Sequence, residues 1–338
     1  MSLRSDVKKS LLFCALATAL ACGGGDDDGD GGAAFEKVLE QQPSALLAIW
    51  GSSASDVWVV GGRPAGEAAG GPTVLHYDGT AWETMDTGET SLDLWWVFGI
   101  SGGPVFMGGS GGAILKYEGG SFERMDTPST GVVFGIWGPS ADDLWAVGGQ
   151  FGGGGGGFAW HYDGTTWEAA AEAPSDVTLF KNNGLGGSDM WIVGEAGTTV
   201  HWDGSALTRE DVATDASFFS IGCASSRCIT VGGEVGRGVA FENAGSGWDA
   251  ARKEDSEELR GACVSGDSAV AVGNTGGIME RTDEDGWVAQ EPATNLSLHA
   301  CWIDSGGGVW AVGGKFDDLP LREGVLVHRG DAVSSDIQ

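Results

Sequence analysis

The sequence predicts an all-β protein made of seven similar four-stranded sheets, and three observations support this. The 338 residues include 61 glycines and 9 prolines, and no long segment shows the 3.6-residue apolar period of a helix. Short runs rich in valine and tryptophan alternate with glycine and aspartate clusters, as in strands joined by turns. A Val-Gly pair, once Met-Gly, recurs about every 40 residues. The pairs are Val60-Gly61, Met107-Gly108, Val147-Gly148, Val193-Gly194, Val231-Gly232, Val272-Gly273 and Val312-Gly313.

Each repeat unit has room for four strands. The third unit gives a first strand "VFGIWGP", an acidic turn "SADD", a second strand "LWAVG" and a third strand "FAWHYDG". Asp-Gly then provides a tight hairpin, and a fourth strand carries an aromatic residue such as Trp167. Four strands per unit of about 40 residues are typical of a β-propeller, so we predict seven four-stranded antiparallel blades.

The tryptophans fall at equivalent points of the repeat. We expect these large flat side chains to fill the wedge between neighbouring blades, because each sheet must bury both faces. The alternative is an aromatic stripe that binds sugar. Trp50, Trp137 and Trp302 match on the first strand, and Trp58, Trp145, Trp191 and Trp310 match on the second.

The two ends of the repeat array predict how the ring closes. The last unit stops after a third strand, "GVLVHRGD", and lacks a fourth. The segment that begins Phe35-Glu36 resembles fourth-strand phrases such as "SFERMD". We therefore expect a strand over 35–39 to pair beside 325–328 and complete the last blade, leaving no open edge. This defines one domain at 34–330, followed by a C-terminal tail at 331–338.

The repeated phrase "IWG-S-x-x-D-V-W-A-V-G…HYDG-x-x-W" resembles the Trp- and Gly-rich β-propeller repeats of secreted bacterial proteins, which are loosely akin to Kelch and Asp-box repeats. The resemblance covers nearly the whole chain after its first residues. It implies the fold but no particular function, because propellers host many activities.

The first residues resemble a bacterial lipoprotein signal peptide. Arg4, Lys8 and Lys9 precede the apolar run "LLFCALATALA", which is too short to span a bilayer, and Ala21 precedes Cys22 as in a lipobox. The resemblance implies a signal peptide at 1–21 and a diacylated Cys22. The stretch 22–33, rich in glycine and aspartate, is expected to be a flexible tether. The alternative is an ordinary secretory peptide with a free cysteine nearby.

The charge of the chain excludes one class of partner. The formal net charge is −30, and the acidic excess is spread along the sequence. Nucleic acids and anionic lipid surfaces need clustered Lys and Arg, so we expect neither as a partner. Contact with a membrane is expected only through the lipid on Cys22.

The cysteines predict disulfides, which an exported protein can form. Cys223 and Cys228 flank the turn between the first two strands of the fifth unit and are expected to staple that hairpin. Cys263 and Cys301 lie on the first strands of units six and seven, where a second bridge is plausible.

No catalytic or metal-binding motif stands out, and we expect neither a metal nor a cofactor. His76, His161, His201 and His328 fall at the same point of different units, too far apart around a ring to share an ion, while His299 is a candidate for the central channel. The "YDGTAW" phrase is similar to an Asp-box, but it is one residue short and lacks the preceding Ser or Thr. We therefore expect a protein that is not an enzyme.

Three long loops interrupt an otherwise regular repeat, at 62–72, 149–157 and 314–324. All join second to third strands, so they emerge on one face, and function commonly lies in such loops. The alternative is neutral variation of loop length. The first and last loops combine scarce cations with apolar groups expected to be exposed. Their candidate ligand-binding residues are Arg63, Lys315, Phe316, Asp317, Asp318, Leu319 and Arg322.

These observations favour a monomeric, lipid-anchored propeller that binds a protein or glycan at the cell envelope. In the Gram-negative lipoproteins that the first residues resemble, an acidic residue after the cysteine favours retention in the inner membrane; Gly23 stands there in this sequence, so the resemblance implies the outer membrane. One alternative is a structural subunit of an envelope complex. Another is a glycan-cleaving enzyme with carboxylates in the central funnel.

Overall fold

The computed structural model describes residues 34–64, 70–150, 152, 156–234, 236–253, 257–282 and 286–338. The expected signal peptide at 1–21, Cys22 and the tether at 22–33 lie outside these residues. Residues Ala33–Gln338 form one compact unit. Within the described ranges, no helix has both the length and the apolar character needed to cross a membrane.

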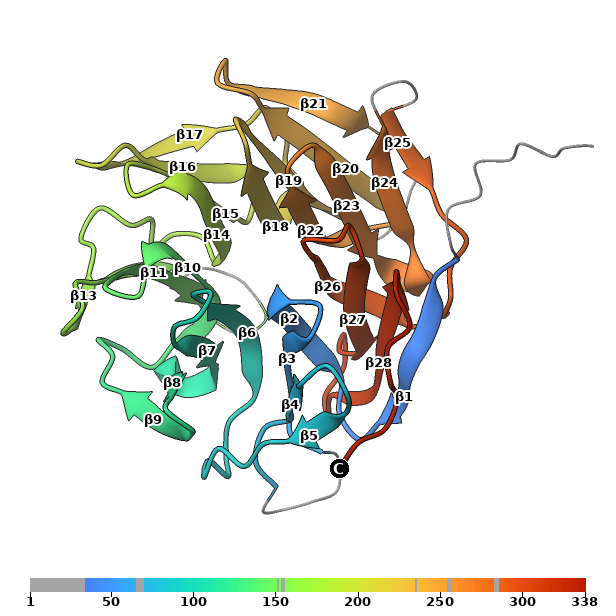
Figure 1. The fold of residues 1–338 in the computed structure, drawn as a ribbon. Coiled ribbons are helices and arrows are strands. Elements are labelled where there is room, and N and C mark those ends of the chain that lie inside the picture. Colours follow the sequence, from blue (N-terminus) through green and yellow to red (C-terminus); the bar gives the residue numbers. More distant parts are fainter. Residues whose placement is uncertain are drawn as a thin grey trace, which may run out of the picture. The chain divides into compact units, whose positions relative to one another are not determined.

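Seven four-stranded antiparallel sheets follow one another around a ring, so the predicted propeller is confirmed (Figure 1). In each blade the first strand is innermost and faces the centre. Blades one to three are β2 (Leu46–Ser53), β3 (Asp56–Gly61), β4 (Val74–Tyr77) and β5 (Trp82–Thr84); β6 (Leu94–Gly99), β7 (Val105–Gly109), β8 (Ile114–Glu118) and β9 (Ser121–Met125); and β10 (Val132–Ser140), β11 (Asp143–Gly149), β12 (Phe158–Tyr162) and β13 (Trp167–Ala169). Blades four and five are β14 (Leu179–Gly186), β15 (Asp189–Gly194), β16 (Thr198–Trp202) and β17 (Leu207–Asp211); and β18 (Ser217–Ala224), β19 (Arg227–Glu234), β20 (Arg237–Asn243) and β21 (Trp248–Lys253). Blades six and seven are β22 (Leu259–Ser265), β23 (Ser268–Gly273), β24 (Ile278–Thr282) and β25 (Gly286–Ala289); and β26 (Ser297–Ile303), β27 (Val309–Lys315), β28 (Arg322–Arg329) and β1 (Glu36–Gln42). Two short 3-10 turns, Ser110–Gly112 and Asn274–Gly276, precede β8 and β24.

The N-terminal strand closes the ring, as the sequence predicts. β1 is the outermost strand of blade seven and pairs antiparallel with β28, with Glu36 opposite His328 and Leu39 opposite Leu326. Leu39 is buried in a core shared by blades seven and one. The strand runs on to Gln42, beyond the expected 35–39, and its register shifts twice along the way.

The C-terminal residues 331–338 also belong to the propeller structure. Ile337 forms a parallel bridge with Trp82, the first residue of β5. The amide of Trp82 donates to the carbonyl of Asp336, and its indole Nε1 donates to the carbonyl of Ser334 at 3.0 Å. The end of the chain therefore runs beside the outermost strand of blade one, next to the blade that β1 completes.

Tryptophans of the first strands fill the wedges between blades, and the glycines that follow them make the space. An ideal Cβ on Gly99 of blade two would lie 2.4 Å from the Trp50 ring of blade one. The same arrangement places Trp137 of blade three against Gly184 of blade four. In blade one, Trp50 therefore fills a gap in blade two, and Gly51 leaves a gap for Trp302 of blade seven.

Gly184→Ala is expected to lower the free energy of unfolding by about 1–3 kcal/mol, because the new methyl group would overlap the Trp137 ring and the Asp189 carbonyl. Gly186→Ala on the same strand is the matched control. Nothing lies within 4 Å of a Cβ there, so a change within about 0.5 kcal/mol is expected. Urea denaturation measures both, and equal losses would contradict the packing argument.

Both predicted disulfides are present. Cys223 and Cys228 lie directly opposite each other on β18 and β19 and close the hairpin of blade five. Cys263 on β22 is bonded to Cys301 on β26, which ties the innermost strands of blades six and seven together. The second bridge therefore holds two neighbouring blades beside the central channel.

Replacing the two disulfides with serine pairs is expected to destabilise the protein unequally. Cys263 and Cys301 are separated by 38 residues, whereas Cys223 and Cys228 are separated by 5. From the entropy of loop closure we expect losses of about 4 and about 2 kcal/mol respectively. Denaturant titration of the two double variants tests this, and a larger loss for the short hairpin bridge would contradict it.

Candidate functional site

A β-bulge occurs at the same point of the innermost strand in every blade. In blade three, Val133 pairs with Gly148 and Gly135 pairs with Val147, so Phe134 between them has no partner. Such a bulge bends the strand and redirects a side chain. Here it turns one residue per blade towards the centre of the ring. The seven bulged residues are Leu47, Trp95, Phe134, Phe180, Phe219, Arg260 and His299.

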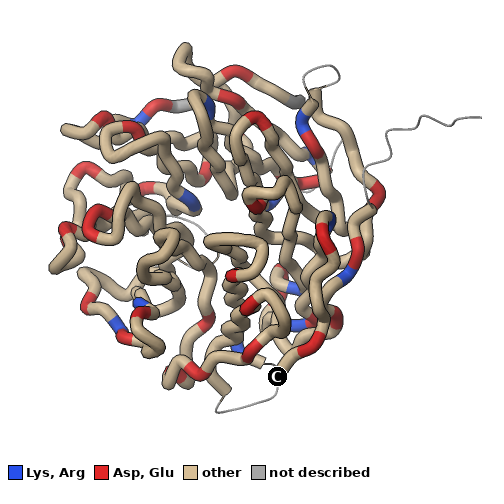
Figure 2. Tube along the Cα trace, viewed as in Figure 1, with Lys and Arg blue, Asp and Glu red and all other residues tan. Residues whose placement is uncertain are grey.

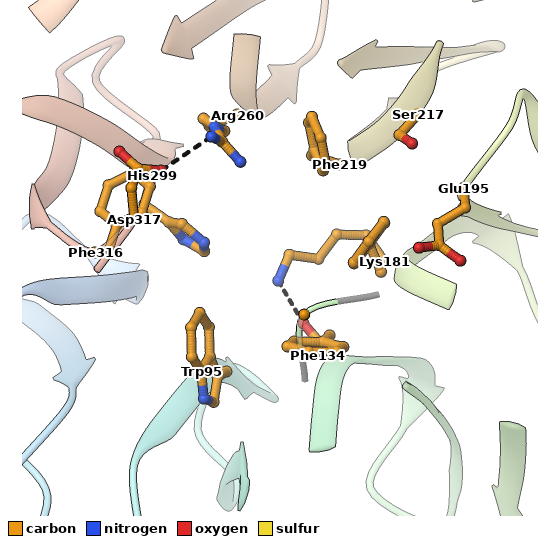
Figure 3. A pocket seen from close by; sticks show the side chains of 12 residues that line it. Trp95, Phe134, Lys181, Glu195, Ser217, Phe219, Arg260, His299, Phe316 and Asp317 are labelled. Carbon is orange, nitrogen blue, oxygen red and sulfur yellow. Dashed lines mark hydrogen bonds and ion pairs between the residues drawn. The ribbon is translucent and has the colours of Figure 1, made fainter. Parts of the chain in front are cut away.

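Six of these residues, all except Leu47, line a cavity of about 330 Å³ at the mouth of the central channel (Figure 3). This volume lies within the range of small-ligand sites. The other lining residues are Gly152, Lys181, Glu195, Ser217, Phe316 and Asp317.

The aromatic residues of the wall touch one another in sequence around the ring. Ring centroids are 5.6 Å apart for Trp95 and Phe134, 5.7 Å for Phe134 and Phe180, and 5.4 Å for Phe180 and Phe219. These tilted and edge-on contacts cover blades two to five, so half of the mouth is a continuous apolar wall.

The remaining arc of the mouth is polar and is completed by a loop residue. The guanidinium of Arg260 lies 4.8 Å from the Phe219 ring and 5.8 Å from the Phe316 ring. Phe316 contacts His299 at 4.9 Å, and His299 contacts Trp95 at 6.1 Å. Bulged residues of six blades and Phe316 therefore form a closed circuit of side-chain contacts.

Arg260 is paired with two acidic residues. Its Nη2 pairs with Glu258 at 2.8 Å and with Asp317 at 3.0 Å. Glu258 is buried, and Asp317 reaches over from the loop after β27. Arg260 thus fixes that loop against blade six at the rim of the cavity.

Lys181 is buried in a different manner. Its side chain is 4% exposed, and Nζ donates to the carbonyl of Phe134 and lies 4.0 Å from the centre of the Trp96 ring. Gly135 of blade three leaves room for Lys181 of blade four to pack against it, since a Cβ on Gly135 would lie 3.0 Å from the Cα of Lys181. Burial lowers the pKa of Lys181 to about 7.

His299 is held as a neutral ring. Its Nδ1 donates to the carbonyl of Leu47, the bulged residue of blade one. Burial, together with the nearby Lys181, lowers the pKa of His299 to about 3. The carbonyls of two bulged residues, Leu47 and Phe134, therefore accept hydrogen bonds from side chains that line the channel.

Only some of the predicted loop residues line the cavity. Phe316 and Asp317 join the cavity, but Phe316 is 7% exposed, so its prediction as an exposed apolar group is wrong. It comes directly after β27 and turns inward onto His299. Leu321, further along the same loop, packs against Gly62, so the loops of blades seven and one do meet.

The other predicted loop residues lie outside the cavity. The amide and Nε of Arg63 donate to Asp93 of blade two, and Lys315 pairs with Glu323 of its own hairpin at 2.6 Å. Arg322 donates to the carbonyl of Pro320. Asp318 and Leu319 are exposed, with Leu319 63% accessible.

Three of the repeated histidines bond and pack within their own blades. His76 lies 2.7 Å from Asp56 and stacks on Trp58, and His161 and His201 repeat this arrangement with Asp143 and Asp189. Each group bonds a third strand to the start of the second strand of the same blade. Among the residues that the structure describes, no cluster of His, Cys, Asp or Glu is arranged to hold a metal ion.

Sequence reasoning missed most of the channel residues. A signal was present in blades one to four, where Leu47, Trp95, Phe134 and Phe180 each stand four residues before the glycine of the first strand. Aligning the repeats on that glycine brings these four residues to one position. If side chains simply alternated along the strand, this position would face a neighbouring blade. The bulge turns it to the channel instead.

Comparison with known proteins supports the fold alone. No family model matches the chain, and no curated protein matches its sequence. Among solved structures, a streptogramin B lyase is similar with a TM-score of 0.67 and 13% identity, over 86% of this chain and 96% of that one. YCF48 bound to D1 peptide is similar with a TM-score of 0.63 and 13% identity, over 88% and 97%. The WD40 propeller domain of Doa1 is similar with a TM-score of 0.66 and 11% identity, over 89% of this chain and 99% of that one.

Lys181→Met is expected to change how stability depends on pH. The lysine is charged in the folded and unfolded states below pH 7, so the cost of burying it is then complete. Between about pH 7 and 10 only the unfolded state keeps the proton. The stability of the unaltered protein should therefore rise relative to Lys181→Met, by about 1.4 kcal/mol per pH unit.

Urea titrations of both proteins at pH 6, 8 and 9 measure this slope. Differences in packing between lysine and methionine are the same at every pH, so they change the difference in unfolding free energy by a constant and leave its slope with pH unaltered. Parallel stability curves would contradict a buried lysine with a lowered pKa.

Proposed function

We propose that the chain is a non-enzymatic binding module, held at the cell envelope by a lipid on Cys22, which takes part of a protein or glycan into the channel mouth. The observation that carries this proposal is the convergence of bulged residues from six blades on one cavity. The proposed binding site is therefore the channel mouth and not, as the sequence suggested, the outer surface of the long loops. The loop at 314–324 contributes through Phe316 and Asp317.

The composition of the mouth supports binding. Aromatic residues with adjoining cations are enriched at the centres of recognition surfaces, where they bury large areas with little loss of side-chain entropy. Acidic residues are spread around the whole ring (Figure 2), and the mouth itself holds two cations, Lys181 and Arg260, beside two acids, Glu195 and Asp317. The likeness to YCF48 bound to a peptide and to a WD40 propeller is consistent with this proposal by analogy of fold.

The carboxylates of the mouth support binding over glycan cleavage. Asp317 is paired with Arg260, and Glu195 accepts a hydrogen bond from the amide of Thr178 at 2.7 Å. A glycosidase needs one carboxyl group that can donate a proton and a second that attacks or activates water. Asp317 and Glu195 are each held by another group, and these contacts place neither of them as the acid or the nucleophile of such a pair.

Partner capture tests the proposed site. The full chain carrying Cys22→Ser would be cross-linked to envelope extracts beside a variant with Phe180→Ala and Phe219→Ala, which opens the aromatic wall. We expect the captured partner to be lost from this variant. Phe122→Ala, a half-buried aromatic on β9 outside the channel, is the matched control and should retain the partner.

Equal capture by all variants would place binding elsewhere and overturn the channel site. Stoichiometric recovery of a membrane protein complex would favour the structural-subunit alternative. Turnover of a glycan that disappears with Asp317→Asn or Glu195→Gln would replace the binding module with an enzyme.

The anchor is tested separately in cells. We expect the unaltered chain to sediment with membranes and Cys22→Ser to remain soluble, because removing the acylated cysteine removes the only predicted membrane contact. Fractionation followed by immunoblotting measures this. Membrane association that survives the substitution would contradict the lipid anchor.

A further inference from the structure

Lys181 is a buried cation without a counter-charge. Among the described residues, no carboxylate lies within ion-pair distance of its Nζ, which contacts the Phe134 carbonyl and the Trp96 ring. The acids described at the mouth have other partners: Asp317 and Glu258 pair with Arg260, and Glu195 accepts a hydrogen bond from the amide of Thr178. A buried charge of this kind is costly unless a paired group compensates it.

We propose that the channel mouth binds a carboxylate attached to an apolar or aromatic group, with the carboxylate on Lys181 and the apolar part against the wall of Trp95, Phe134, Phe180 and Phe219. This rests on the proposed function and names the class of ligand. The carboxylate would supply the negative charge that the protein does not place beside Lys181.

The geometry of the mouth fits such a ligand. Lys181 projects into the cavity between Phe134 and Phe219, so its amine lies beside the aromatic wall (Figure 3). The volume of about 330 Å³ exceeds that of one aromatic ring with a short acidic chain. The chain carries a net charge of −30, which repels anions at long range, so an anion that binds needs a local cation such as Lys181.

Binding should be linked to proton uptake by Lys181. The charged or titratable groups that face it are Arg260 from β22, His299 from β26, Glu195 from the loop after β15 and Asp317 from the loop after β27. Trp95, Phe134, Phe219 and Ser217 face it without titrating. His299 stays neutral above pH 6, because its pKa lies at about 3. Lys181 is therefore the group that changes charge between pH 6.5 and 8.5.

The test is calorimetric titration of the full chain carrying Cys22→Ser with 3-phenylpropionate and with its neutral amide, 3-phenylpropanamide. At pH 6.5 the carboxylate should bind at least about tenfold more tightly than the amide. At pH 8, titrations in buffers of different ionisation enthalpy should show nearly one proton taken up per carboxylate bound, and affinity should fall up to about tenfold between pH 7 and 8.5.

Lys181→Met should abolish both the preference for the carboxylate and the proton uptake, while binding of the amide persists. Persistent amide binding shows that the variant remains folded. Lys116→Met is the matched control, because Lys116 lies on β8 outside the channel and pairs with Glu118 at 2.7 Å. It should bind both probes as the unaltered chain does.

A second pair of probes distinguishes the sources of the carboxylate. The peptide Gly-Gly-Gly-Phe with a free C-terminus would be compared with its C-terminal amide. Tighter binding of the free peptide than of phenylpropionate assigns the site to a protein C-terminus, and the reverse assigns it to a small free acid. Either result supports the proposal.

Equal binding of carboxylate and amide, with no proton uptake, would overturn this inference and leave the channel mouth as a binding site. Failure of all four probes at millimolar concentration would also overturn it. The proposed function is then decided by partner capture, which depends on no small probe.

Discussion

The pairing of β1 with β28 is the contact on which the rest of the structure depends. It turns seven sheets in a row into a closed ring, because the first described strand of the chain supplies the strand that the last blade lacks. Closure fixes where each innermost strand lies relative to the others. The same seven bulges in an open array would lie along a line, whereas in the ring they face a common centre.

The first strand of each repeat contains positions that pack against a neighbouring blade and a bulged position that faces the channel. The tryptophan and glycine of the first strand pack one blade on the next, as Trp50 does against Gly99 and Trp137 against Gly184, so the neighbouring blade limits the size of these side chains. The bulged position faces the channel and meets no such constraint. It reads Leu, Trp, Phe, Phe, Phe, Arg and His from blade one to blade seven. The scaffold is therefore repetitive, and the chemistry of the mouth is distributed unevenly on it.

Much of the fold could be predicted from the sequence because it depends on periodic features. The Val-Gly spacing gave the number of blades, and the likeness of Phe35-Glu36 to the fourth-strand phrases indicated how the ring closes. The Cys223–Cys228 disulfide followed from strand positions that the repeat supplies, whereas these positions left the Cys263–Cys301 disulfide open. Residues 331–338 carry no repeat phrase, and their pairing beside Trp82 became evident only in the structure.

The site could be predicted only in part because it depends on departures from regular geometry. A bulge shifts one residue out of alternation, so Phe134 and Phe180 face the channel although strand pattern alone would pack them between blades. The burial of Lys181 depends on Gly135 in the preceding blade and on Trp96 in the blade before that. Phe316 follows a strand directly and turns inward, whereas loop residues are ordinarily expected in solvent.

The antiparallel pairing of β1 with β28 also determines how the ring responds to mechanical force. Glu36 lies opposite His328, so the two ends of the propeller leave the same end of this ladder. A pull that separates them would unzip the pairs one at a time instead of loading the whole ladder in shear. Residues 334–338 run beside β5 and are bonded to Trp82, so such a pull must first detach the C-terminus from blade one. The short terminal segment therefore acts as a mechanical latch that shields the closing strand.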